Sequence, residues 1–381
     1  MERAGREWLL LAASVAASTL LALLLLRWLV PGLFGVAPDL RVVQVDEEVP
    51  PFYENVFRAE DASGEELLLQ DPYTVVRMQP LRPDGPTGPT DILGFRNRAV
   101  PSRADVVAIG DSQTFGLNAS LEDNWPSRLD AALGESASVY AMASGGWGAV
   151  QYLDMFRKAL FLKPRLVIVA FYSGNDALES LRTAYAVARW SELRVDPELD
   201  PDARPPAPPA PEVDIWEARF GAGDTEFMVF TPGRRLYSNR EHPAVDTGWE
   251  IMAVVGRRIA AEARSADVRV IFTIIPTKER VYAELVDAAG LAAPADYAQL
   301  VAAEQRRVAK LRLELAKLEG AEFVDLLPGL RHAARQGHTH LRGPDGHPKP
   351  RGYAAIAEAL TPAAAAALIE NRDSEPSMLI E

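Results

Sequence analysis

A short apolar run that ends at a Gly-Asp-Ser tripeptide constrains the fold of this chain more than any other feature. Residues 106–109 are Val-Val-Ala-Ile, which is typical of a parallel strand buried on both faces. The run breaks at Gly110 and Asp111, so Ser112 is predicted to follow the carboxyl end of the strand. Open α/β sheets bind their ligands at that edge. Ser112 is therefore a candidate nucleophile, although most serines after a strand are turn or helix-capping residues.

Four more segments predict strands, and helical patterns separate them. Two of these strands end, like the first, in glycine and polar residues, which follow the sequences VYAMAS and RLVIVAFY. The other two are predicted at residues 268–275 and 322–326, and helices are predicted at residues 124–133 and 299–318. Five strands joined by helices favour a parallel, doubly wound sheet.

The strand ends and the C-terminal part of the chain together offer the groups that a serine needs for acyl transfer. The chemistry requires a base for the hydroxyl proton, a carboxylate that orients the imidazole, and hydrogen-bond donors for the oxyanion. Asp345 and His347 lie just ahead of a helical pattern near the C-terminus, and they are the candidates for the carboxylate and the base. Each part of the machinery has a candidate in the sequence.

These segments resemble the four sequence blocks of the SGNH (GDSL-type) hydrolase superfamily, in the same order. The sequence GDSQT is similar to the first block and implies that Ser112 is the nucleophile. The resemblance implies an oxyanion hole made of the backbone N–H groups of Ser112 and Gly146 and the side-chain amide of Asn175. It also implies a triad completed by His347 and Asp345, a three-layer α/β/α fold, and a reaction that needs neither a metal nor an organic cofactor.

The resemblance has two departures and one informative spacing. Ala141 stands where the family usually has Asn, and Ser173 stands where it usually has Gly. Asp345 and His347 are two residues apart rather than three, a spacing similar to that of the alginate O-acetyltransferase-like branch of the superfamily. The alternative interpretation of Asp345 is that it is a turn residue beside Gly346.

Four residues are weaker candidates for substrate contacts because they follow strand ends: Trp147, Tyr172, Lys278 and Tyr282. Sugar rings pack readily on aromatic side chains, but each of the four is individually more typical of a packing or surface residue. The other histidines are His242, His332, His338 and His340, which the sequence places in polar, loop-like surroundings. Because no third ligand is in register with His338 and His340, solvated loop histidines are favoured over a metal site.

The composition excludes some kinds of chemistry and partner, and the N-terminal segment indicates where in the cell the protein lies. The chain has no cysteine, which excludes a disulfide framework and a thiol nucleophile, and its net charge of −13 argues against nucleic acid as a partner. Residues 8–26 form an uncharged apolar run long enough to cross a bilayer, and Arg3 and Arg6 precede it. We expect a single-pass anchor in the bacterial inner (cytoplasmic) membrane with the catalytic domain on the periplasmic or extracellular side. A cleaved signal peptide is the competing interpretation.

The expected organisation has four parts. They are a cytoplasmic tip and anchor (1–37), a stalk and lead-in (38–103), an SGNH-like catalytic domain (104–369), and a disordered tail (370–381). Within the catalytic domain, an insertion at about 177–246 carries the run ARPPAPPAPEV, whose prolines favour an extended conformation. That insertion is either a mobile surface excursion or part of a lid over the site.

Three classes of function remain open from the sequence. The first is a serine esterase that removes acyl groups, expected to be those of an envelope or extracellular carbohydrate. The second is an O-acetyltransferase that uses the same triad on a polysaccharide, with a membrane acyl-transfer protein as a possible partner. The third, which the complete set of catalytic residues disfavours, is a noncatalytic binding protein on the same fold.

Overall fold

The computed structural model describes residues 68–71, 73–85, 87–200, 203, 205–206, 214–220 and 227–373, with the side chains described through residue 369. The apolar run at 8–26, the start of the expected stalk, most of the proline-rich run and residues 374–381 lie outside the described residues. The predictions of an anchor and of its orientation fall on that part of the chain.

Five parallel strands form the central sheet, in the order β4-β3-β5-β8-β9. They are β3 (Val106–Gly110), β4 (Val139–Ala143), β5 (Leu166–Tyr172), β8 (Arg269–Ile275) and β9 (Ala321–Val324). The prediction of a five-stranded, parallel, doubly wound sheet is confirmed. The chain runs from β3 to β4 on one side and then crosses to β5 on the other, so the strand order reverses beside β3. Sheets of this kind bind ligands at that reversal, outside the carboxyl ends of the strands.

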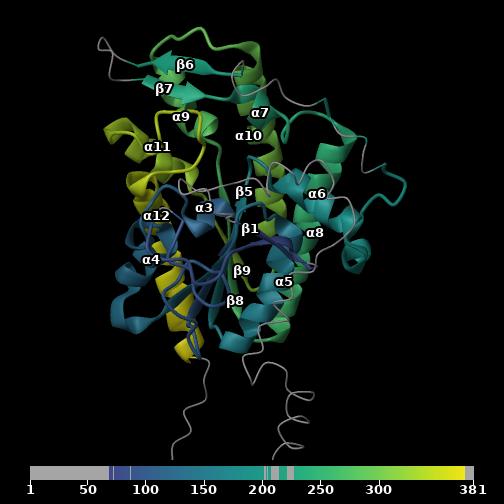
Figure 1. Ribbon diagram of the computed structural model, residues 1–381, viewed down its shortest axis with the longest axis vertical. Helices are drawn as coiled ribbons and strands as arrows, with labels where there is room; N and C mark the ends of the chain where they lie inside the picture. Colours follow the sequence, from purple (N-terminus) through teal and green to yellow (C-terminus); the bar gives the residue numbers. More distant parts are fainter. Residues whose placement is uncertain are drawn as a thin grey trace, which may run out of the picture. The chain divides into compact units, whose positions relative to one another are not determined.

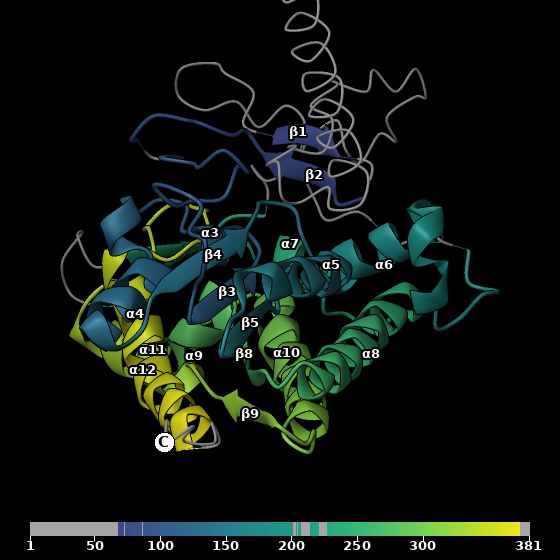
Figure 2. The ribbon, with the colours of Figure 1, turned by 90° about the horizontal axis from the view of Figure 1, so that it is seen from below.

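Helices cover both faces of the sheet, as the three-layer prediction requires (Figure 2). Val107 and Ile109 of β3 pack with α5 (Ala149–Ala159), α6 (Asp176–Ala186) and α8 (Pro243–Ser265). Val106 and Ala108 point to the opposite face, because successive side chains of a strand alternate. The helices of that face are α4 (Trp125–Leu133), α9 (Lys278–Ala288), α11 (Leu327–Gln336) and α12 (Pro350–Asp373), while α10 (Ala295–Leu315) contributes to both cores.

Short elements connect these layers. Within the described residues, the remaining α-helices are α3 (Ser112–Phe115) and α7 (Pro232–Leu236), and the 3-10 helices are η2 (Leu121–Asp123), η3 (Gly134–Ser136), η4 (Leu160–Leu162) and η5 (Ala188–Leu193). The predicted helix at 124–133 is confirmed as α4, with Asn124 as its N-cap. The predicted helix at 299–318 is present as α10, but it begins and ends earlier in the chain.

The described part of the expected stalk packs onto the sheet. Strands β1 (Leu68–Asp71) and β2 (Val75–Met78) form an antiparallel hairpin. Val76 and Phe95 belong to the same core as the sheet, and the Trp147 indole N–H donates to the carbonyl of Val76 at 2.6 Å. Residues 68–103 therefore brace the loop after β4, although their sequence has no long apolar pattern.

The described part of the proposed insertion is largely regular structure. It holds α6, η5, α7, the first residues of α8, and an antiparallel hairpin of β6 (Trp216–Arg219) and β7 (Phe227–Phe230), which lies near α7 and α9 (Figure 1). The sequence argument missed α6 because it followed the proline content of the segment rather than the helical spacing of Leu178 and Leu181, which are buried.

One helix among the described residues is long and apolar enough to span a membrane, by length and composition alone. It is the Pro350–Ile369 part of α12, and half of its most apolar window is buried inside the protein. Tyr353, Ile356 and Leu360 are fully buried in the core that this helix shares with the sheet. Core helices of globular domains are apolar for this reason. The helix continues to Asp373, so it includes the first residues of the expected tail.

Candidate active site

The loop after β3 places Ser112 at the first position of α3. Asp111 is the N-cap of this helix, and its Oδ1 accepts a hydrogen bond from the backbone N–H of Gln113 at 2.8 Å. The strand-to-helix turn needs Gly110, because a Cβ there would lie 2.1 Å from Oγ1 of Thr114. Three local features of the sequence therefore set the position of Ser112. They are the apolar strand before it, the glycine at position 110, and the Asp111 cap.

His347 bridges the serine and the carboxylate that the sequence predicted. Its Nε2 lies 2.8 Å from Oγ of Ser112, and its Nδ1 lies 2.7 Å from Oδ1 of Asp345. Because an ionised carboxylate only accepts hydrogen bonds, Nδ1 carries the proton and Nε2 is left to accept the serine proton. This is the arrangement that a general base requires.

The two-residue spacing of Asp345 and His347 has a structural reason. Oδ1 of Asp345 accepts from the backbone N–H of His347 at 2.7 Å, as in an Asx turn, and it also contacts the ring of the same residue. The two interpretations of Asp345, turn residue and imidazole partner, therefore hold together. Partial burial would raise the pKa of this carboxyl, but the hydrogen bond and the charge of His347 outweigh it and hold the pKa well below its usual range.

The predicted oxyanion donors follow three adjacent strands at the same edge of the sheet. Ser112 follows β3, Gly146 follows β4, and Asn175 follows β5. Gly146 has a φ of 74°, a left-handed conformation that favours glycine. Asn175 is half-buried and precedes α6, and within the described chain its side chain makes no hydrogen bond. Three donors at neighbouring strand ends can converge on one small oxygen.

The unusual serine in the third block has a partner that the sequence did not indicate. Oγ of Ser173 donates to Oε1 of Glu304 at 2.6 Å, and the same carboxylate accepts from the backbone N–H of Thr277 at 3.0 Å. Glu304 is fully buried on α10, and burial raises its pKa. It thus ties the loop after β5 to the loop after β8. A glycine at position 173 would lack this connection.

The unusual alanine in the second block lies beside Asn97. The Asn97 amide donates to the carbonyl of Ala141 at 2.9 Å and accepts from its N–H at 3.1 Å. Both contacts are to the backbone of β4, so they do not depend on the side chain at position 141. The alanine therefore leaves the described anchoring of this strand intact.

Two buried carboxylates lie beneath the site and bind backbone groups. Oδ2 of Asp176 accepts from the N–H of Tyr172 and from the hydroxyl of Tyr152, both at 2.8 Å. Burial raises the pKa of Asp176 well above its usual value and that of Asp111 to about 6. Their hydrogen bonds to backbone groups give both aspartates a structural role.

The four weaker substrate candidates are all buried: Trp147, Tyr172, Lys278 and Tyr282 are at most 2% exposed. The indole N–H of Trp147 and the hydroxyl of Tyr282 contact backbone groups of Val76 and Thr339, and the ammonium of Lys278 contacts backbone carbonyls. The ring of Tyr172 lies against Gly174, where a Cβ would come within 2.3 Å of it. In the described structure these side chains shape the loops rather than presenting a free face to a sugar.

The prediction of solvated loop histidines is wrong for His340. Its ring is 1% exposed and packs edge-on against Tyr282 with a centroid separation of 6.0 Å, and burial lowers its pKa well below the usual value. His332 lies in α11, and His242 caps α8 with its ring nitrogen. The polar neighbours of these histidines in the sequence did not reveal the tertiary contacts.

Sequence reasoning also missed Arg96, a buried cation that supports the nucleophile. Its guanidinium donates to the carbonyls of Gly116 and Ala119 at 2.6 and 2.7 Å, in the segment just after α3. It also contacts the carbonyls of Gly85 and Gly88 and lies over the ring of Phe115. The only signal was its place in the segment expected as a stalk and lead-in to the catalytic domain (38–103).

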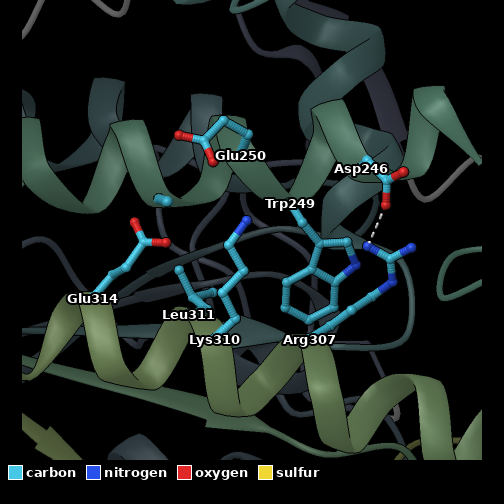
Figure 3. A pocket seen from close by; sticks show the side chains of 8 residues that line it. Asp246, Trp249, Glu250, Arg307, Lys310, Leu311 and Glu314 are labelled. Atoms are coloured by element: carbon cyan, nitrogen blue, oxygen red, sulfur yellow. Dashed lines mark ion pairs between the residues drawn. The ribbon is translucent and has the colours of Figure 1, made fainter. Parts of the chain in front are cut away.

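A separate small cavity of about 130 Å³ lies between α8 and α10 (Figure 3). Trp249 and Leu311 form its apolar lining, and Asp246 pairs with Arg307 at 2.8 Å on one side. None of the predicted catalytic residues lines this cavity, so it is no part of the candidate active site.

Comparison with known proteins places the chain in a family. The family model for the GDSL-like lipase/acylhydrolase family matches residues 108–355. The chain belongs to this family. The matched range begins in β3 and ends in α12, so it covers every residue of the predicted triad and oxyanion hole. No curated protein sequence matches the chain.

The chain is also similar, at low sequence identity, to solved structures. A GDSL-like lipase of Bacteroides thetaiotaomicron is 14% identical, with 69% of this chain and 88% of that chain covered and a TM-score of 0.36. A catalytic mutant of the acetylxylan esterase Axe2 of Geobacillus stearothermophilus is 11% identical, with 70% and 95% covered and a TM-score of 0.38. TesA is 14% identical, with 69% and 98% covered and a TM-score of 0.37.

Proposed function

We propose that the chain is a serine esterase that uses Ser112, His347 and Asp345 to cleave acyl esters. The observation that carries the proposal is the continuous hydrogen-bonded path from Ser112 Oγ through the imidazole to the Asp345 carboxylate, at 2.8 and 2.7 Å. Membership of an acylhydrolase family supports the same reaction class.

The mechanism follows from the geometry. As Oγ of Ser112 attacks the ester carbonyl, Nε2 of His347 takes the hydroxyl proton, and Asp345 stabilises the imidazolium that forms. The backbone N–H groups of Ser112 and Gly146 and the amide of Asn175 receive the negative charge of the tetrahedral intermediate. His347 then gives its proton to the leaving alcohol. In the second half, water attacks the acyl-enzyme while His347 takes one of its protons. The bond between Ser112 Oγ and the acyl carbon then breaks, His347 returns the proton to Oγ, and the carboxylic acid departs.

The proposed substrate is an acylated carbohydrate of the cell envelope or the extracellular space. The apolar run at 8–26 supports this location. With Arg3 and Arg6 ahead of it, the run would hold the catalytic domain at the outer face of the inner membrane. A reporter fused after Glu381 should then be active only outside the cytoplasm, and the mature protein should retain residues 1–30. A soluble form that begins near residue 38 would instead indicate a cleaved signal.

O-acetyl transfer to a polysaccharide is the second candidate, and the two-residue spacing of Asp345 and His347 favours it. Both reactions proceed through the same acyl-serine and differ only in the attacking group. Transfer requires a site that excludes water and binds the acceptor hydroxyl, and a membrane partner would supply the acyl group.

One experiment separates the candidates. The purified protein is incubated with a fluorophosphonate probe, and separately with p-nitrophenyl acetate in the presence and absence of oligosaccharides, with free acetate and acetylated sugar measured by mass spectrometry. An esterase gives labelling at Ser112 and free acetate as the main product. Acetylated sugar as the main product in excess water would make the protein a transferase. A folded protein without labelling or turnover would support the noncatalytic class.

A further inference from the structure

The turn that carries Asp345 and His347 is an excursion from the body of the domain. It leaves and rejoins the fold at an isolated β-bridge between His340 and Pro348. The Asp345 side chain is 43% exposed and that of His347 is 19% exposed, and neither residue belongs to the hydrophobic cores of the domain. Their geometry must nonetheless be precise, because a misplacement of about 1 Å can reduce a rate about 100-fold.

A buried ammonium group lies under this turn. Nζ of Lys278 donates to the carbonyls of Gly343 at 2.6 Å, Asp345 at 2.9 Å and Leu341 at 3.4 Å. The three carbonyls come from alternate residues of the turn and point to one centre, and an ammonium group has three N–H donors to match them. Lys278 is 1% exposed, so its charge lies away from solvent.

The position of Lys278 is itself fixed by the fold. It is the first residue of α9, after the N-cap Thr277, whose hydroxyl and N–H both bind the buried carboxylate of Glu304. The same carboxylate binds Ser173 in the loop that carries Asn175. The loop after β5, the loop after β8 and the acid–base turn are thus joined through Glu304 and Lys278.

We propose that Lys278 is a positioning residue, whose charged ammonium group holds the acid–base turn so that His347 reaches Ser112. This inference rests on the proposed function of the same site. Arg235 of α7 also packs against this turn at Gly346, where a Cβ would lie 2.5 Å from its guanidinium. Two cations from different helices therefore contact the backbone of the turn.

Burial of the ammonium group makes this connection sensitive to pH. Burial, with a smaller effect of Arg235, lowers the pKa of Lys278 to about 8, although Glu279 and Asp345 act in the opposite direction. His340 and the Phe230 ring, 5.7 Å from Nζ, also face the group. Loss of the proton removes one donor and the charge, so we expect activity to fall as the pH rises through about 8.

Stability should change in the opposite direction over the same interval. The pKa of Lys278 is lower in the folded protein than in the unfolded chain, so the folded protein binds this proton less tightly. Linkage then makes the Lys278 contribution to the free energy of unfolding rise as the pH increases from about 8 toward 10.5. A lysine with a purely structural role would show the same rise in stability without the fall in activity.

The test compares the wild-type protein with Lys278→Met, which keeps the length of the side chain without its charge, Lys278→Arg, which keeps the charge, and the exposed control Lys317→Met. We expect Lys278→Met to lower kcat about 100-fold with little change in KM. It should also lose the fall in activity above pH 8, and hydrogen exchange of residues 341–347 should be faster. Lys278→Arg should retain a higher kcat than Lys278→Met and move the fall to higher pH. Lys317→Met should match the wild type.

The inference would be overturned by a folded Lys278→Met with wild-type kcat and wild-type exchange in the turn. If Lys278→Met does not fold, the wild-type pH profile decides, because constant activity from pH 7 to 10 contradicts the proposal. Failure of the proposed function has a different signature: the wild type itself would show no turnover or labelling. The exchange comparison would still test whether Lys278 holds the turn.

Discussion

The two halves of the candidate active site are built in different ways. The half that carries Ser112 grows out of β3, an inner strand whose five residues are all buried, and its own cap at Asp111 closes the turn. The half that carries His347 is a largely exposed turn, held by bonds from residues distant in the sequence. A buried cation binds backbone carbonyls in each half, Arg96 in the first and Lys278 in the second.

Because the two halves are held in different ways, we expect mutations in them to have different effects on rate and on stability. The nucleophile can be displaced only when the sheet core opens, which requires most of the free energy of unfolding. The acid–base turn can move when a few tethers are lost, with the sheet intact. Mutations around His347 should therefore lower the rate in folded protein, whereas mutations beneath Ser112 should also change stability.

The largest effect is expected where the two halves meet. Ser112→Ala and His347→Ala should each reduce kcat by on the order of 10⁶-fold, because neither the nucleophile nor the base acts without the other. The double variant should be no worse than either single variant. Steady-state kinetics on p-nitrophenyl acetate would check this, with the exposed Ser102→Ala as the control. Losses that multiply in the double variant would mean that the two residues do not act as a unit.

Asp345→Asn should reduce kcat by about 10⁴-fold, because the imidazole loses the carboxylate that fixes its tautomer. The pKa of Asp345 is held well below its usual range, so the carboxylate should stay ionised in mild acid and should not itself limit activity near pH 5. Kinetics and circular dichroism of Asp345→Asn, with the exposed Asp84→Asn as the control, provide the measurement. Activity close to wild type would show that the orienting carboxylate comes from elsewhere.

Asn175→Ala should lower kcat by about 100- to 1,000-fold, the usual cost of one oxyanion donor. The change should leave KM and the thermal unfolding temperature nearly unaltered, since the described structure gives the Asn175 side chain no hydrogen bond to lose. Measurement of kcat and KM separately, together with differential scanning calorimetry, would check both parts. A rise in KM at constant kcat would assign Asn175 to substrate binding instead.

The smallest effect on rate is expected for Asp111→Asn. This variant tests the buried carboxylate next to Ser112. Burial raises the pKa of Asp111 to about 6 from the ordinary value of 3.8, so the folded protein binds this proton more tightly than the unfolded chain. Its contribution to stability therefore falls as the pH rises from about 4 to 6. Asparagine keeps an acceptor for the N–H of Gln113 and does not titrate. Asp111→Asn should be more stable than the wild type above pH 6, and the gain should vanish below pH 4.

Urea unfolding at a series of pH values measures this difference. Identical pH dependence in the two proteins would mean that Asp111 does not carry the shifted titration. The neighbouring Asp176, whose carboxylate also interacts with Asp111, would then be the next variant to examine.

The sequence by itself determined the sheet and the identity of the groups that meet at its edge. Strands buried on both faces are continuous apolar runs, and their ends are marked by glycine and polar residues, so β3, β4 and β5 could be read directly with Ser112, Gly146 and Asn175 behind them. The pair Asp345 and His347 was likewise a local pattern. Periodicity and motifs depend only on residues that are close together along the chain, so the sequence alone reveals them.

Only the tertiary structure decided how these groups are held. Arg96 lies 20 residues from Gly116 and Lys278 lies 67 residues from Asp345, and no local pattern links a cation to the carbonyls it binds so far along the chain. Glu304 and Ser173, whose side chains form a hydrogen bond, are likewise far apart along the chain, and no local pattern links them. Backbone carbonyls are present at every residue, so the sequence cannot mark which of them will converge on a buried charge. That choice is made when the helices pack on the sheet and exclude water from the loops at its edge.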